Sequence, residues 1–149
     1  KEIVDSYDFK RIVYLGSNAL KGISQESALK MLELTAGEVV TMYDTPLGFR
    51  HGPKSIVDDD TLTVIYISDN SYSRQYEVDL IKEMSGQRKG NKIGKFDNIL
   101  LGFDYIILAQ TVAVLKSLAM GKTPDNPCPT GEVNRVVKGV TLYPYSKGE

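Results

Sequence analysis

Three charged side chains in the first quarter of the chain have the spacing of one helix face. Glu26, Lys30 and Glu33 lie at i, i+4 and i+7, so a helix would project all three in one direction. A carboxylate beside an ammonium can act as a general base, because each group shifts the proton affinity of the other. The alternative is a solvated helix face, in which each such pair contributes only a few tenths of a kcal/mol. The spacing predicts the shared face and leaves both roles open.

The only histidine, His51, lies in a loop beside Arg50, between Phe49 and the Gly52–Pro53 pair. Imidazole is the side chain best suited to moving protons near neutral pH. A lone loop histidine is nevertheless more often incidental than catalytic. A zinc site is not expected, because one histidine and one cysteine are too few ligands.

Two loops follow apolar runs, where ligands of parallel sheets bind. Gly16, Ser17 and Asn18 end the first run, but the spacing of a dinucleotide-binding fingerprint is absent. Residues 68–74 supply hydroxyls at the start of a helix, but with an acidic residue and no glycine, so we interpret them as an N-capping turn. Cys128 stands between two prolines with no basic neighbour, which argues against a catalytic thiol.

The composition is that of one soluble globular domain. The 149 residues include 18 Lys+Arg and 19 Asp+Glu, so no basic excess favours nucleic acid. The apolar stretch 99–120 is interrupted by polar residues, which predicts a buried core helix rather than a membrane span. The chain opens at Lys1 without a signal core, so we expect a cytoplasmic protein that is processed or is a piece of a longer one.

Short apolar runs alternate with helical patterns, which is typical of a parallel α/β sheet. We expect strands at 12–15, 39–43 and 62–67. We expect helices at 25–34, capped by Ser24 and followed by Gly37, and at 72–84 and 105–120. The segment 44–53 reads as an irregular loop, 93–96 as a poor strand, and 136–145 as extended.

Four segments carry a specific resemblance. Residues 14–17, 25–35, 46–54 and 123–135 resemble the second sugar isomerase (SIS) domain of the tagatose-6-phosphate ketose/aldose isomerase family, also described as galactosamine-6-phosphate deaminase/isomerase. A more distant resemblance is to the isomerase half of glucosamine-6-phosphate synthase. The resemblance implies a three-layer α-β-α sandwich with a mainly parallel, roughly five-stranded sheet. Residues 1–149 would form a single SIS domain, the second of a longer chain, with a tail at 122–149 that helps to close the site.

The resemblance also implies roles for individual residues. Glu33 matches the base that moves the proton between C2 and C1, Lys30 the lysine beside it, His51 the ring-opening histidine and Lys138 a tail lysine near the sugar. The loop before His51 is two residues longer than in the synthase, and the tail has one extra residue before Lys138. The residues expected to bind substrate are Gly16, Ser17, Glu26 and Arg50.

The implied function is an aldose–ketose isomerase that converts galactosamine-6-phosphate to tagatose-6-phosphate and ammonia. No metal or organic cofactor is implied, because the open-chain carbonyl already acidifies C2. The family's phosphate loop belongs to the first SIS domain, so another SIS domain of the same protein is the expected partner, in a homodimer or larger homo-oligomer. In the synthase the histidine comes from the partner chain. The alternative is a non-catalytic, sugar-phosphate-binding SIS regulatory module. No nucleic-acid or membrane partner is expected.

Overall fold

The computed structural model describes residues 1–87, 102–131 and 143–144. Within these ranges, three parallel strands form a sheet in the order β2-β1-β3. The strands are β1 (Arg11–Gly16), β2 (Val40–Asp44) and β3 (Thr61–Tyr66). Each agrees with a predicted strand to within one or two residues at its ends, and the α/β class is confirmed. The segments 93–96 and 136–142 lie outside the described residues.

The central strand, β1, pairs with β2 from Arg11↔Val40 and with β3 from Arg11↔Thr61. Its residues from Ile12 to Gly16 are all buried, as expected of a parallel strand covered on both faces. Alternate side chains then serve opposite faces: Ile12 and Tyr14 belong to one core cluster, and Val13 and Leu15 to the other.

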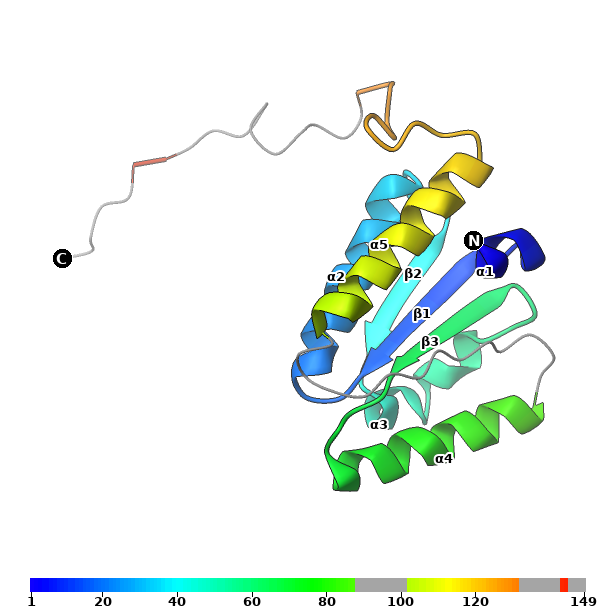
Figure 1. The fold of residues 1–149 in the computed structure, drawn as a ribbon, viewed down its shortest axis with the longest axis vertical. Helices are drawn as coiled ribbons and strands as arrows, with labels where there is room; N and C mark the ends of the chain where they lie inside the picture. The colour runs from blue at the N-terminus through cyan, green and yellow to red at the C-terminus, as the bar shows by residue number, and fades with distance from the viewer. Residues whose placement is uncertain (88–101, 132–142, 145–149) are drawn as a thin grey trace.

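Helices cover both faces of the sheet and give the predicted three-layer sandwich (Figure 1). One layer holds α2 (Ala19–Leu34) and α5 (Gly102–Ala119), which pack side by side over Ile12 and Tyr14. The other holds the short α3 (Pro46–Phe49) and α4 (Ser71–Gln87), which cover Val13 and Leu15. The short N-terminal α1 (Glu2–Ser6) was not predicted and packs near α5.

The start of α2 differs from the prediction by more than any other helix boundary. Helix α2 begins at Ala19, six residues before the expected start, so Ser24 is not an N-cap. Ser24 is buried inside the helix, where its hydroxyl donates to the Leu20 carbonyl at 2.9 Å. The expected C-terminal signal is confirmed, because Gly37 follows the helix with a φ of 78°.

The segment 44–53, predicted as an irregular loop, contains α3, and its last residue begins a 3₁₀ turn, η1 (Pro53–Ile56). The Thr45 hydroxyl caps α3 by accepting a hydrogen bond from Gly48 N at 3.0 Å, and Pro46 takes the first helical position. A capping threonine followed by proline is a helix-start signal, hidden here among turn-forming residues.

The predicted core helix at 105–120 is present as α5 and is buried on only one side. Tyr105, Ala109 and Ala113 lie in the core. Its length and mean hydropathy of 1.3 would also suit a membrane span, and 39% of it is buried. On the opposite side Phe103 is 75% exposed and Ile107 59% exposed. Within the described residues, nothing covers this apolar side of α5.

Candidate functional site

The predicted charged face is present on α2. Lys30 Nζ lies 2.8 Å from Glu33 Oε2 and 3.4 Å from Glu26 Oε1. The hydrogen bond that Lys30 donates to Glu33 is the main cause of a raised pKa at Lys30, so the side chain stays an ammonium across neutral pH. Glu33 remains half exposed, at 50%. The structure thus joins the three predicted side chains in one network that solvent or a ligand can reach.

Apolar side chains border this charged network on the same helix. Leu29 is 42% exposed and Leu32 is 40% exposed, although α2 is otherwise packed against the sheet and α5. Helical spacing puts both leucines on the same side of the carboxylate–ammonium pair, so this part of α2 is a mixed apolar and charged face. A surface that covered these leucines would also exclude water from Glu33, which would strengthen electrostatic interactions there.

Glu33 does not lie at the carboxyl edge of the sheet. Only the first turn of α2 meets that edge, and Glu33 stands 14 residues after Ala19, or about 21 Å along the helix axis. The expectation that site residues lie where the first strand ends therefore holds for Gly16 and Ser17 only. The network formed by Glu26, Lys30 and Glu33 lies instead on the outer side of the helical layer.

Arg50 and His51 lie in the opposite layer. Arg50 Nε is 3.2 Å from Glu83 Oε2 on α4, and Lys54 Nζ also contacts the Glu83 carboxylate. The hydrogen bond from Lys54, with the nearby Arg50 charge, lowers the pKa of Glu83. His51 itself is exposed. Because the sheet separates this loop from α2, His51 and Glu33 are not brought together within the described part of the chain.

Gly16 is required by the close approach of β1 to α2. A Cβ at this position would lie 2.4 Å from the Leu20 carbonyl oxygen, which is backbone and cannot move aside easily. Two residues later Asn18 has φ 51° and ψ −124°, a conformation that costs a non-glycine residue free energy. The chain therefore turns tightly from strand into helix at Gly16–Asn18.

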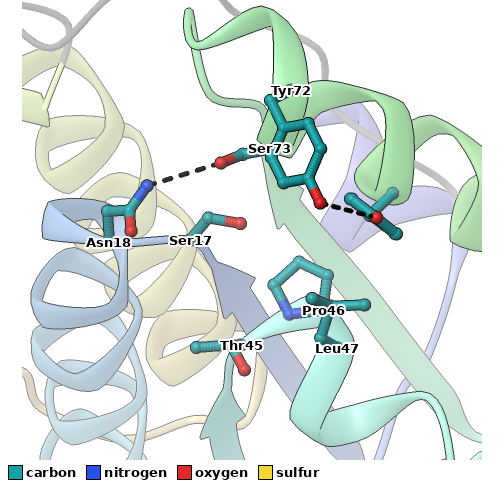
Figure 2. Close-up of a pocket in the computed structure, with 8 residues that line it drawn as sticks. Ser17, Asn18, Thr45, Pro46, Leu47, Tyr72 and Ser73 are labelled. Carbon is teal, nitrogen blue, oxygen red and sulfur yellow. Dashed lines mark hydrogen bonds between the residues drawn. The ribbon is translucent and has the colours of Figure 1, made fainter.

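Ser17 lines a cavity of about 280 Å³ at the carboxyl edge of the sheet (Figure 2). Asn18 reaches across the opening, with Nδ2 3.5 Å from Ser73 Oγ. The sequence reasoning singled out Ser17 but missed most of the cavity. An available signal was the i, i+4 pair of tyrosines at the start of α4. The residues that line the cavity are Ser17, Asn18, Thr45, Pro46, Leu47, Tyr72, Ser73 and Tyr76.

The 68–74 segment is an N-capping turn, as predicted. Asn70 Oδ1 accepts hydrogen bonds from the backbone N–H groups of Tyr72 and Ser73, each at 3.1 Å. The turn is anchored by Glu77, a buried carboxylate that sequence analysis did not identify. Its Oε2 accepts a hydrogen bond from Ser68 N at 2.7 Å. Lys138, the remaining predicted site residue, lies outside the described residues.

Comparisons with known proteins match nearly the whole chain. A D-galactosamine-6-phosphate deaminase from Shewanella sp. (strain ANA-3) is 45% identical over 149 residues, covering 93% of this chain and 39% of the relative. A Clostridium novyi structure, provisionally named a tagatose-6-phosphate ketose/aldose isomerase, superposes with a TM-score of 0.87 at 46% identity. The match covers 97% of this chain and 43% of that one.

The structure of tagatose-6-phosphate ketose/aldose isomerase from Escherichia coli gives a TM-score of 0.80 at 40% identity, covering 97% of this chain and 42% of that one. No protein-family model matches. The chain spans about two-fifths of the length of these relatives. The resemblance predicted from the sequence is confirmed: the chain is homologous to a segment of the galactosamine-6-phosphate deaminase and tagatose-6-phosphate ketose/aldose isomerase family.

Proposed function

We propose that this chain supplies the proton-transfer residues of an aldose–ketose isomerase that deaminates galactosamine-6-phosphate to tagatose-6-phosphate. The names of the relatives given above identify these two sugar phosphates as what those proteins act on. The observation that carries the proposal is the bond between Lys30 and Glu33 on an accessible, leucine-bordered face of α2.

In the proposed mechanism Glu33 is the base. With the sugar in its open-chain form, the Glu33 carboxylate removes the proton from C2 and gives an enolamine. Return of the proton to C1 leaves an imine at C2, and water then hydrolyses the imine to the ketone and ammonia. Lys30 stabilises the negative charge that develops on the C1 oxygen. These steps balance with one water consumed and one ammonia released.

His51 and Lys138 complete the proposal by resemblance to the family. His51 would assist ring opening, from a neighbouring subunit, because the sheet lies between it and Glu33 in the chain itself. Lys138 would approach the sugar from the tail. Glu26 is assigned to holding Lys30 in place at 3.4 Å. Arg50 is assigned to holding the loop of His51 in place, because its guanidinium pairs with Glu83 on α4.

We further propose that the 6-phosphate is held by another SIS domain of the same protein, within a cytoplasmic homodimer or larger homo-oligomer. In the described residues, the N-terminal amides of α4 that a phosphate would use are bound to Asn70. The chain also covers only two-fifths of its relatives' length. The exposed apolar side of α5, with Phe103 and Ile107, offers a surface on which this other SIS domain would pack.

Replacing Glu33 by Gln in the full-length protein tests the mechanism. The amide cannot accept the C2 proton, so exchange of C2–H with deuterated water should fall by about 10²- to 10⁴-fold. Glu38→Gln is the matched control, because Glu38 also pairs with a lysine, Lys122, at 2.6 Å but lies outside the network. Undiminished exchange in the Glu33 variant would remove this residue from the mechanism.

A further inference from the structure

The cavity at the carboxyl edge is lined by residues without ionised side chains. Ser17, Thr45 and Ser73 contribute hydroxyls, Asn18 an amide, and Tyr72 and Tyr76 phenols, over an apolar base of Pro46 and Leu47. Every one of these polar groups can both donate and accept a hydrogen bond. At about 280 Å³, the cavity is close to the lower limit of about 300 Å³ for small-molecule pockets. This chemistry suits a small neutral molecule with several hydroxyls.

The surroundings of the cavity disfavour an anion. The backbone amides of Tyr72 and Ser73, which open α4, already donate to Asn70 Oδ1. An adjoining hollow that shares Ser17 and Asn18 is lined by Asp69, an exposed carboxylate. The nearby Lys21 ammonium lies 3.7 Å from Asp44. Among the described residues, a phosphate here would therefore find no cationic side chain in the lining, N–H groups that are already occupied, and a carboxylate in the adjoining hollow.

Two tyrosines give the cavity an aromatic wall. Their rings meet edge to face, with centroids 5.3 Å apart and an interplanar angle of 72°. Their hydroxyls lie 3.0 Å apart, and this hydrogen bond raises the pKa of Tyr76. Tyr72 is nevertheless 68% exposed. An exposed ring with its hydroxyl fixed by a neighbour is a preorganised surface for the apolar face of another ring.

We propose that this cavity binds an uncharged polyhydroxylated ring, the chemistry of an unphosphorylated monosaccharide. The ring would lie against Tyr72 and exchange hydrogen bonds with Ser17, Thr45 and Ser73. Asn18, held in its strained conformation, spans the opening toward Ser73. The site lies at the opposite end of α2 from Glu33 and does not depend on the proposed catalytic role of Glu33.

The test uses the full-length protein labelled with 3-fluorotyrosine and titrated with D-galactose. The ¹⁹F resonances of Tyr72 and Tyr76, assigned from the Tyr72→Phe and Tyr76→Phe variants, should shift saturably. Ser73→Ala removes one hydrogen bond and should weaken the apparent affinity by about fivefold. Ser71→Ala is the matched control, because Ser71 opens the same helix without lining the cavity. Glu33→Gln should leave the galactose titration unchanged. This result is expected whether or not the variant loses isomerase activity, so the test of the cavity is independent of the proposed role of Glu33.

Three results would overturn the proposal. One is the absence of a saturable shift with galactose at concentrations well above millimolar. Another is a shift of the same resonances by inorganic phosphate, which would make the cavity an anion site. The third is an equal loss of affinity in Ser71→Ala and Ser73→Ala, which would place the effect in the stability of α4 rather than in the cavity.

Discussion

The Lys30 ammonium donates a hydrogen bond to Glu33 Oε2 at 2.8 Å, and this bond is the largest cause of the raised pKa of Lys30. Replacing Glu33 by Gln removes the negative charge that favours the ammonium, so the pKa of Lys30 should fall toward its ordinary value. Side-chain NMR of labelled lysines, titrated through the alkaline range, measures the change. A control variant, Glu38→Gln, should leave the pKa of Lys30 unchanged. An unaltered Lys30 titration in Glu33→Gln would mean that the pair is broken in solution.

Glu83 joins the loop of His51 to α4 through Arg50 and Lys54. On the proposed catalytic role of His51, we expect Glu83→Gln to lower kcat of the full-length protein several-fold, because misplacement of a catalytic group by about 1 Å is costly. Stability should change little, since exposed ion pairs contribute about 0–1 kcal/mol. Asp79→Asn is the control, because Asp79 pairs with Lys82 on the same helix. Equal kcat in the two variants would separate Glu83 from the positioning of His51.

Asp58 forms hydrogen bonds with the first residue of β3 and the first residue of β1. Its carboxylate accepts hydrogen bonds from Thr61 at 2.6 Å and from Arg11 at 2.7 Å, and these bonds lower its pKa to about 2. Because the folded pKa lies below the unfolded value of 3.8, the contribution is present above about pH 4 and is lost as the pH falls toward 2. Asp58→Asn should therefore reduce stability at neutral pH and flatten its acid dependence in this window.

Urea unfolding at a series of pH values measures the effect of Asp58. Asp59→Asn, at the neighbouring position, should leave the acid dependence of the wild type intact. Should Asp58→Asn show the same slope between pH 4 and 2 as the wild type, the hydrogen bonds of Asp58 would not govern acid stability.

Phe103 and Ile107 are exposed in this chain at 75% and 59%, so substituting them should cost little unless another domain covers them. In the full-length protein we expect Phe103→Ser with Ile107→Ser to lower the free energy of unfolding by more than about 2 kcal/mol. Asp104→Ser, an exposed position on the same helix, should stay within about 0.5 kcal/mol of the wild type. A double variant as stable as the control would show that this side of α5 remains in solvent.

The sequence predicted the strands well because each is a short, mostly apolar run; β1 and β3 are largely buried, whereas β2 is exposed or half-buried. It placed the start of α2 too late, because Lys21, Gly22 and Ser24 hide the apolar spacing of its first turns. The joint face of Glu26, Lys30 and Glu33 followed from helical periodicity alone. The separation of His51 from Glu33 could not be predicted, because it depends on the strand order and on which layer each connection crosses.

The order β2-β1-β3 also constrains how the domain is made. The strand that comes first along the chain occupies the centre of the sheet, and both its partners are synthesised after it. A nascent chain therefore exposes β1, which is buried from Ile12 to Gly16 in the fold, until Tyr66, the last residue of β3, has left the ribosome. Parallel pairings between distant segments form slowly. During that interval the apolar side chains of β1 are open to aggregation, and a chaperone that bound them would prevent it.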